Sequence, residues 1–255
     1  MDINLNADLG ESFGAYTMGN DAALLAIVGS ANVACGFHGG DPLVMADTVR
    51  LAREHGVSLG AHPAFPDLQG FGRRPMKLAP RELAAVVIYQ VGALMGMARS
   101  QGMAVTHVKP HGAMSNMACE DAAMATTIAN AVKAIDPGLI LLAPALSELA
   151  KAGRAAGLRV ADEVFADRAY QDDGNLVPRS QPGAVLKDSA ACLAQVLRML
   201  DAGGIVSVSG RVLPTTFHSI CVHGDNAHAV ATAAAIRDGL QAAGHRLRGL
   251  PELVG

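Results

Sequence analysis

Residues that can do chemistry recur in this sequence where short apolar runs end. Seven polar clusters combine Gly with His, Asp, Glu, Asn, Lys or Arg: Asn6-Ala-Asp-Leu-Gly-Glu11, Cys35-Gly-Phe-His-Gly-Gly-Asp41, Gly60-Ala-His-Pro-Ala-Phe-Pro-Asp67, Lys109-Pro-His111, Glu163-Val-Phe-Ala-Asp-Arg168, Leu176-Val-Pro-Arg179 and Cys221-Val-His-Gly-Asp-Asn226. Polar groups that follow buried strands are how an α/β enzyme builds one shared active site. We therefore expect an enzyme.

Two carboxylates follow the first of these apolar runs. Asp8 and Glu11 flank Gly10, whose conformational freedom permits a tight turn that would bring both carboxylates to one place. Such a pair could ligate a metal or act in general acid/base catalysis. Capping a helix or forming a turn is the structural alternative for both.

Two histidines follow the next two runs. His38 is surrounded by glycines, which let backbone N–H groups approach an anion, and His62 lies in Gly-Ala-His-Pro. Asp41 precedes Pro42 and most simply caps the next helix. Together with Asp8, the two imidazoles could hold a divalent transition metal with open positions. The common signature of two histidines one helical turn apart is missing.

Lys109 and His111 are fixed on one rigid turn by Pro110 and Gly112. Burial would lower the pKa of Lys109 and make it a base, whereas a contact with a phosphate or carboxylate is equally natural for a lysine. The candidate catalytic residues are therefore Asp8, Glu11, His38, His62, Lys109 and His111.

Other polar residues could bind a substrate or a phosphate group. Arg73 and Arg74 lie in a long Pro/Gly-rich stretch, Pro63–Pro75, whose length predicts a loop over the site. Either arginine could hold a carboxylate with two hydrogen bonds or remain a solvated charge. The remaining binding candidates are Asn6, Glu163, Asp167, Arg168, Arg179 and His223. We assign no role to His55, His107, His228 or His245.

The elements that would carry these clusters alternate along the chain. Short apolar runs predict strands at Ile3–Asp8, Ala31–Cys35, Val57–Ala61, Ala104–Val108, Leu139–Ala143, Leu158–Ala161, Ile205–Val208 and Ser219–Val222. Helical patterns cover Pro42–His55, Pro80–Gln101, Glu120–Ile135, Leu146–Ala156, Ala184–Asp201 and Asn226–Ala243. Repeated strand–helix units imply parallel strands with right-handed crossovers.

A closed barrel accounts for the clusters better than an open sheet does. An open sheet usually concentrates its site at one switch point, whereas here nearly every predicted strand ends in polar residues. The 255 residues, 51% of them apolar, are enough for a single domain over 1–255. Residues 205–222 contain two predicted strands without a helix between them, which predicts a hairpin or an extra strand at the barrel seam.

Composition and charge argue against several classes of partner. With a net charge of −3 and no long basic run, the chain has no positive electrostatic field that would attract nucleic acid or an anionic membrane. The four cysteines form no C-x-x-C pair, which favours free thiols in a reducing compartment. Residues 1–20 show no signal-peptide pattern, and the apolar stretches are too short and polar to span a bilayer. We expect the protein to be cytoplasmic, and the sequence leaves a homo-oligomer open.

The motifs, taken in order, resemble the LamB/YcsF family. They are Asn6-Ala-Asp-Leu-Gly-Glu-Ser-Phe-Gly14, Asn32-Val-Ala-Cys-Gly-Phe-His38, Gly60-Ala-His-Pro63, Val108-Lys-Pro-His-Gly-Ala113, Phe165-Ala-Asp-Arg168, Val177-Pro-Arg-Ser180 and Val222-His-Gly-Asp225. The resemblance runs from residue 2 to about residue 246. Gly39 stands where the family usually has Ala, and Met114-Ser115 replaces a usual Leu-Tyr pair.

The resemblance implies a seven-stranded (β/α) barrel similar to the glycoside hydrolase/deacetylase superfamily. It also implies ATP-dependent opening of 5-oxo-L-proline (pyroglutamate) to L-glutamate, together with two partner subunits, B and C. Metal-dependent deacetylases of that superfamily use an Asp-His-His set, to which Asp8, His38 and His62 are similar. Because the sequence has no G-x-x-x-x-G-K-[ST] phosphate loop, we expect the partners to contribute to the use of ATP.

Two other functions are consistent with the residues. The first is a stand-alone metal-dependent hydrolase of N-acetyl or carbohydrate amides, which would need neither ATP nor partner subunits. The second is a non-catalytic binding protein in carbohydrate metabolism or regulation, which would retain a ligand without turnover.

Overall fold

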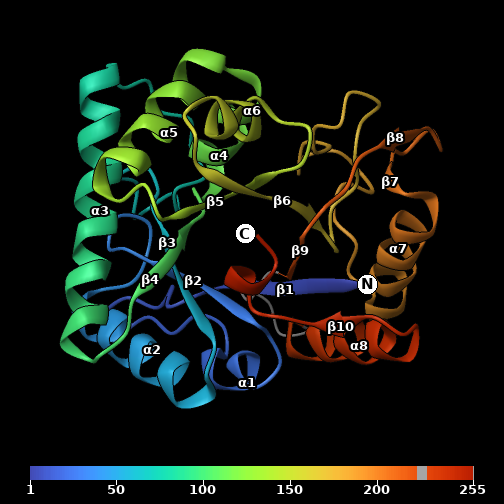
Figure 1. Ribbon diagram of the computed structural model, residues 1–255, viewed down its shortest axis with the longest axis horizontal. Helices are drawn as coiled ribbons and strands as arrows, with labels where there is room; N and C mark the ends of the chain where they lie inside the picture. The colour runs from blue at the N-terminus through green and yellow to red at the C-terminus, as the bar shows by residue number, and fades with distance from the viewer. Residues whose placement is uncertain (223–228, 255) are drawn as a thin grey trace.

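Parallel strands close into a barrel in the computed structural model, which describes residues 1–222 and 229–254 (Figure 1). The seven barrel strands within those residues are β1 (Asp2–Leu9), β2 (Ser30–Ala34), β3 (Ser58–His62), β4 (Val105–Val108), β5 (Ile140–Pro144), β6 (Arg159–Phe165) and β9 (Ser219–Val222). Each pairs in parallel with the next, and β9 pairs with both β6 and β1. The predicted seven-stranded barrel is confirmed.

Helices pack around the outside of the strands (Figure 1). The longer ones are α2 (Pro42–His55), α3 (Pro80–Ser100), α5 (Ala122–Ile135), α6 (Glu148–Ala155), α7 (Ser189–Ala202) and α8 (Ala229–Ala242). Helix α2 has the bounds that the sequence predicts. It begins where the Asp41 carboxylate accepts hydrogen bonds from the backbone N–H groups of Leu43 and Val44, and it ends at Gly56 in the left-handed conformation.

Some helix predictions were wrong in their bounds. The predicted helix Glu120–Ile135 is preceded by a separate one, α4 (Gly112–Glu120), and the break at Asp121 gives α5 a side-chain cap. Helix α7 begins only at Ser189, where Asp188 accepts a hydrogen bond from Ala191. A short helix, α1 (Asp21–Leu25), was missed because five residues are too few to show a 3.6-residue period.

The segment 205–222 contains a hairpin, but not between the two strands that the sequence predicts, because the connection between them holds a strand of its own. Strands β7 (Gly204–Val206) and β8 (Val212–Pro214) pair antiparallel outside the barrel, and β9 then takes the last barrel position. Strand β10 (Arg246–Leu247) pairs with the beginning of β1, and the short 3₁₀ helix η1 (Leu250–Glu252) follows it.

Helix α3 is long and apolar enough, among the described helices, to cross a membrane. Its apolar residues instead pack on the protein: Leu83, Val87, Val91 and Leu94 are buried, and the helix contacts α2, α5, β3 and β4. Ile88 and Tyr89 on the same helix are exposed. The expectation that the apolar stretches are too short and polar to span a bilayer was wrong for this helix, by length and composition.

The interior of the barrel is polar along β1. Asn4, Asn6 and Asp8 alternate with apolar residues and are all buried. Asn6 donates to Glu163 on β6, and Asp8 contacts Lys109 just after β4, although neither β6 nor β4 is a neighbour of β1 in the sheet. The contacts therefore cross the inside of the barrel, and the polar interior leads to the ends of the strands.

We expect Gly40→Ala to destabilise the protein more than Gly56→Ala does, because only Gly40 is tightly enclosed. Both glycines have positive φ, 79° and 66°, which costs an L-residue about 1–2 kcal/mol. A methyl group at Gly40 would also lie 2.7 Å from the carbonyl oxygens of Ala34 and Gly10, whereas Gly56 faces open space. Such a clash adds about 1–3 kcal/mol. Urea unfolding of the two variants measures the difference, and equal losses would contradict this account of how the loops after β1 and β2 pack.

Candidate active site

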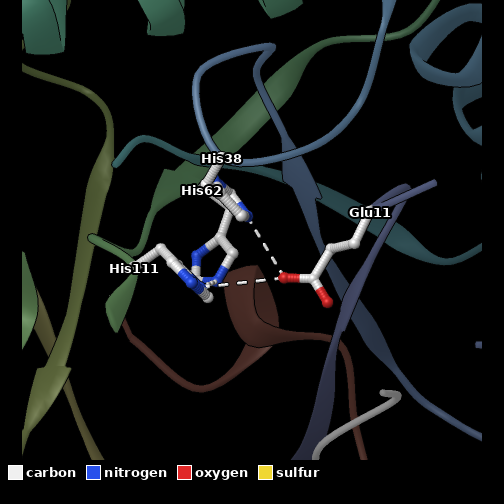
Figure 2. A group of neighbouring side chains, drawn as sticks. All are labelled: Glu11, His38, His62 and His111. Carbon is white, nitrogen blue, oxygen red and sulfur yellow. Dashed lines mark hydrogen bonds and ion pairs between the residues drawn. The ribbon is translucent and has the colours of Figure 1, made fainter. Parts of the chain in front are cut away.

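Four residues meet where the first four barrel strands end (Figure 2). Glu11 follows β1, His38 follows β2, His62 ends β3 and His111 follows β4. One ligand atom of each lies within 4.8 Å of the others, and all four side chains are buried. The rings of His38 and His111 are stacked, with centroids 3.9 Å apart and planes inclined by 7°. The structure thus adds Glu11 and His111 to the predicted pair His38 and His62.

Backbone carbonyl groups fix the tautomers of two of these histidines. Nδ1 of His62 lies 2.6 Å from the carbonyl oxygen of Lys109, and Nε2 of His111 lies 2.9 Å from that of Phe71. A carbonyl oxygen can only accept, so both of these nitrogens carry hydrogen. In a neutral ring the other nitrogen, Nε2 for His62 and Nδ1 for His111, presents a lone pair to the site.

The two lone pairs face one another, since Nε2 of His62 and Nδ1 of His111 are 2.9 Å apart. Two unshared pairs at this distance repel unless a proton or a metal ion lies between them. A separation of about 2.9 Å is also what two neighbouring ligands at about 2.1 Å from one metal ion would give. Nitrogen and carboxylate donors of this kind fit a divalent transition metal.

The protonation of the stacked histidines favours this ligand role. Burial, and then the neighbouring His62, lowers the pKa of His38 well below 6.5. Burial, and then His38, does the same to the pKa of His111. Nε2 of His38 lies 3.1 Å from Oε1 of Glu11, whereas its Nδ1 is buried without a hydrogen-bond partner among the described residues. Neutral rings can bind a metal, and His62 and His111 are the better oriented of the three.

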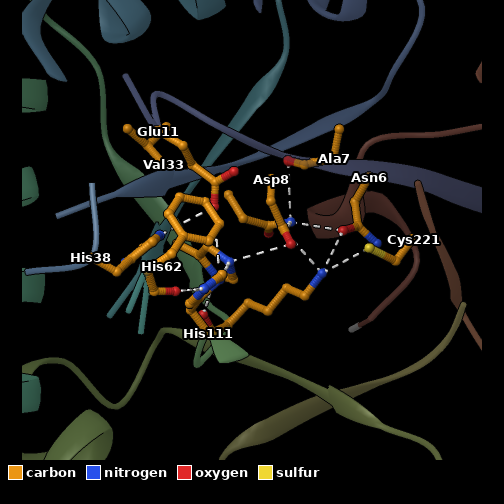
Figure 3. Close-up of polar contacts among 12 residues, drawn as sticks. Asn6, Ala7, Asp8, Glu11, Val33, His38, His62, His111 and Cys221 are labelled. Atoms are coloured by element: carbon orange, nitrogen blue, oxygen red, sulfur yellow. Dashed lines mark hydrogen bonds and ion pairs between the residues drawn. The ribbon is translucent and has the colours of Figure 1, made fainter. Parts of the chain in front are cut away.

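Asp8 connects these histidines to a buried lysine (Figure 3). Its Oδ2 lies 3.3 Å from Nε2 of His62, and its Oδ1 lies 3.0 Å from Nζ of Lys109. Lys109 also contacts Oε1 of Glu163 at 3.0 Å and Sγ of Cys221 at 3.0 Å. Asp8 is outside the group of four, so the Asp8, His38 and His62 ligand set stays a prediction.

Of the two roles that the sequence leaves open for Lys109, its pKa favours a charge contact over a base. Burial alone would lower its pKa, but the carboxylates of Asp8 and Glu163 oppose this and raise the pKa well above its usual value. Burial raises the pKa of Glu163 in turn, with Lys109 opposing. Burial also raises the pKa of the Cys221 thiol. Lys109 is therefore an ammonium group that can stabilise negative charge but cannot accept a proton.

Two further residues that the sequence did not single out lie beneath Asp8. Nδ2 of Asn32, on β2, donates to Oδ1 of Asp8 at 2.9 Å and to Oδ1 of Asn6 at 2.7 Å. Nε2 of His107, on β4, lies 3.0 Å from Oδ1 of Asn32. The only signal for them was a polar residue inside an apolar strand pattern.

A cavity of about 390 Å³ opens beside these residues, and arginines line it. Asp8, His62, Lys109 and His111 are at its inner part, together with Arg73, Arg168 and Arg179. Burial, and then the like charge of Arg179, lowers the pKa of Arg168 to about 10. The guanidinium groups suit an anionic group of a ligand, although the carboxylates of Asp8, Glu120 and Asp173 line the same cavity.

The loop after β3 contacts the histidines, as its length predicted. Phe71 has a positive φ of 54°, and its ring lies edge-on to His38 and His111. The guanidinium of Arg73 lies 4.9 Å from the centre of that ring. A non-glycine residue in this conformation is strained, and such strain often occurs at functional sites.

Some predicted site residues lie elsewhere. Arg74 does not line the described cavity, because its guanidinium pairs with Asp67 and holds the loop together. Asp167 is also absent from the described cavity lining, although Asn6 and Glu163 lie in the polar interior just beneath it. His223 is outside the described residues. All four cysteines are free thiols, as predicted.

A family model described as "LamB/YcsF family" matches residues 3–255 of this chain. The chain belongs to this family. Relatives include the 5-oxoprolinase A subunit of Azoarcus sp. (strain BH72), 64% identical over 99% of this chain and 99% of that protein. The 5-oxoprolinase A subunit of Bacillus subtilis (strain 168) is 52% identical over 98% of this chain and 97% of that protein.

Two solved structures share the fold of this chain. The lactam utilization protein from Thermus thermophilus superposes with a TM-score of 0.92 at 45% identity, covering 98% of this chain and 100% of that one. The catalytic domain of a peptidoglycan N-acetylglucosamine deacetylase from Eubacterium rectale gives a TM-score of 0.52 at 13% identity, covering 98% of this chain and 88% of that one. The second likeness is one of fold alone.

The two departures from the usual LamB/YcsF residues lie at the site. A methyl group at Gly39 would come within 2.6 Å of the backbone oxygen of Glu11, so this chain packs its first two loops too closely for alanine. Ser115 lines the cavity, whereas Met114 is buried in the core.

We expect the purified chain, once stripped of metal, to bind one divalent transition ion. Alanine at His62 or His111 should weaken binding by more than the about 10–100-fold that loss of an outer-shell partner costs. Calorimetric titration with Zn²⁺ or Co²⁺ measures the affinity, and His55→Ala on the exposed end of α2 is the matched control. Equal affinities in the wild-type chain, the His62 and His111 variants and the His55 control would show that the ion binds elsewhere.

Acid should destabilise the protein partly through His107. Burial, and then Lys109, lowers the pKa of His107 to about 3, so below pH 6.5 the unfolded chain takes up a proton that the folded chain does not. Stability therefore falls as the pH drops from 6.5 towards 3, by about 1.4 kcal/mol per pH unit from this group. Denaturant unfolding with chelator at pH 7.5, 6.0 and 5.0 should show a shallower loss in His107→Gln. Parallel losses in both proteins would refute this.

Proposed function

We propose that this chain acts as the A subunit of a 5-oxoprolinase, which opens 5-oxo-L-proline to L-glutamate with ATP and partner subunits B and C. Relatives named as the A subunit of 5-oxoprolinase, similar over nearly the whole chain, support a role in 5-oxoproline metabolism and in a complex. The observation that carries the enzymatic role is the buried group of Glu11, His38, His62 and His111 beside Asp8 and Lys109. The proposed place of action is the cytoplasm.

The chemical difficulty of the reaction explains the need for ATP. A five-membered lactam is a stable amide with a poorly electrophilic carbonyl carbon. Phosphorylation of the lactam oxygen makes that carbon electrophilic, so water can add to it. The ring C–N bond then breaks as its nitrogen takes up a proton, and hydrolysis of the resulting acyl phosphate by a second water releases phosphate and L-glutamate. Because the sequence has no Walker-type phosphate loop, we assign the use of ATP to the partner subunits and the attack of water to this barrel.

The charge of each residue around the cavity indicates its proposed role. Asp8 is the carboxylate at its inner part, and its Oδ2 is turned towards His62, so it is the proposed general base for water. The Lys109 ammonium would stabilise negative charge that develops on the reacting oxygen. Arg73, Arg168 and Arg179 would bind the carboxylate or phosphate of the substrate.

The group of Glu11, His38, His62 and His111 would hold a divalent metal. When bound there, such an ion supplies Lewis acidity to a carbonyl or phosphoryl oxygen and acidifies water. The protein's part is to present the lone pairs of His62 and His111, which the carbonyl groups of Lys109 and Phe71 orient.

A stand-alone metal-dependent amide hydrolase is the second candidate, and the same lone-pair geometry favours it. It requires neither ATP nor partner subunits. An assay of N-acetylated sugars and of 5-oxoproline, each with and without ATP, distinguishes the two functions.

We expect Asp8→Asn to lower lactam opening by about 10²–10⁴-fold, the usual contribution of a general base, while the chain still folds. His38→Ala should also abolish most activity. The assay follows glutamate release from 5-oxoproline and ATP by the chain reconstituted with its partner subunits. Exposed residues of α2 provide matched controls, Asp47→Asn and His55→Ala.

Activity of the wild-type complex that depends on both ATP and this chain supports the proposal. Full turnover by Asp8→Asn would remove Asp8 from the mechanism. Turnover of 5-oxoproline by the partner subunits alone would refute the function itself.

A further inference from the structure

We propose that His107 is a positioning residue that, through Asn32, sets the orientation of the Asp8 carboxylate. The catalytic consequence rests on the proposed function of Asp8, whereas the positioning itself can be tested without it. His107 does not touch the described cavity, so any effect on catalysis must pass through other residues.

The amide of Asn32 has only one orientation that satisfies its neighbours. Its Nδ2 is surrounded by oxygen atoms, Oδ1 of Asp8 at 2.9 Å, Oδ1 of Asn6 at 2.7 Å and the carbonyl oxygen of Ala7 at 3.3 Å. An amide nitrogen donates and these oxygens accept. Turning the amide over would bring Oδ1 against them and leave a buried carboxylate facing a carbonyl dipole of the same sign.

His107 stabilises this orientation from the other side. Its Nε2 lies 3.0 Å from Oδ1 of Asn32, and because that oxygen only accepts, Nε2 carries the hydrogen. Its Nδ1 lies 2.9 Å from the hydroxyl oxygen of Thr106, whose single hydrogen this nitrogen shares with the carbonyl oxygen of Leu59 at 3.0 Å. The ring, Asn32 and Asp8 thus form a chain of hydrogen bonds from β4 through β2 to the end of β1.

The consequence for Asp8 is a fixed carboxylate plane. Oδ1 is held by Asn32 and by the Lys109 ammonium, at 2.9 and 3.0 Å. Oδ2 is then left facing Nε2 of His62 at 3.3 Å (Figure 3). If Asn32 loses its orientation, its hydrogen bond to Oδ1 is lost, and the carboxylate can rotate away from His62.

The fold makes room for the ring of His107. Gly60 on β3 is its cross-strand partner, and the register shifts at this point. A Cβ at residue 60 would lie 2.1 Å from Nε2 of His107 and 2.2 Å from its Cδ2. Any side chain at residue 60 would displace the imidazole, so Gly60 is required wherever His107 is to reach Asn32.

Two amide substitutions at His107 test the inference. The amide nitrogen of Gln can take the place of Nε2 and donate to Asn32, whereas that of Asn is one methylene too short. We expect His107→Asn to lower kcat by about 10–100-fold, the range typical of outer-shell partners, with KM nearly unchanged. His107→Gln should retain most of the wild-type kcat, and His55→Asn is the control for exchange of a histidine outside the site.

A third variant tests the coupling through Gly60. Gly60→Ala should lower kcat as much as His107→Asn does. When Gly60→Ala is added to His107→Ala, which removes the ring that the new methyl group would clash with, kcat should fall little further. Independent, additive losses would show that the two residues act separately and would contradict the inference.

Crystal structures of His107→Asn and His107→Gln without substrate separate the inference from the proposed function. The expected result is a turned Asn32 amide and a rotated Asp8 carboxylate in His107→Asn only, with metal affinity unchanged in both variants. An Asn32 and Asp8 that stay in place in His107→Asn would overturn the inference whatever the enzyme does. Equal kcat in the two variants, measured in an active reconstituted complex, would overturn it as well. A complex inactive even with the wild-type chain would count against the proposed function alone.

Discussion

The ion pairs of Lys109 inside the barrel are the interaction on which the rest of the site depends. An ammonium group in a closed interior is very costly unless carboxylates and hydrogen-bond acceptors surround it. Asp8 and Glu163 provide the two opposite charges at 3.0 Å each, and Oδ1 of Asn6 lies at 3.2 Å. Removal of one partner from such a buried pair typically costs about 3–5 kcal/mol, because the remaining charge is left without compensation.

These contacts also determine how the mouth of the barrel is built. Lys109, Asp8 and Glu163 belong to the end of β4, to β1 and to β6, which are not neighbours in the sheet, so their pairing ties opposite walls together. The backbone of Lys109 has a second effect, since its carbonyl oxygen sets the tautomer of His62. One residue thus fixes both a buried charge and the tautomer of His62. The interior of a barrel is usually apolar. Here it is polar, and its side chains hold the residues of the site in place.

Much of the site could be predicted from the sequence because parallel strands all end at the same face of a barrel. Asp8, His38, His62 and His111 each follow an apolar run, and local sequence is enough to place them there. The protonation of Lys109 could not be predicted in this way. Its pKa depends on Asp8 and Glu163, which are more than fifty residues distant in the chain and adjacent only in the folded barrel.

Asn32 and His107 were missed for a related reason. They lie within strands, where one polar residue carries no local signal that it points into the barrel rather than outwards. Arg74 illustrates the reverse error, because it follows Arg73 directly and yet pairs with Asp67 outside the cavity lining of the described residues. Neighbours in sequence were separated by the fold, and distant residues were brought together.

The most direct test of the account is a crystal structure of the chain with 5-oxo-L-proline bound. The account predicts the lactam in the cavity, with its carboxylate towards Arg73, Arg168 and Arg179 and its ring carbonyl near Asp8, His62 and Lys109. A lactam bound at another surface, with this cavity filled only by solvent at saturating ligand, would contradict it.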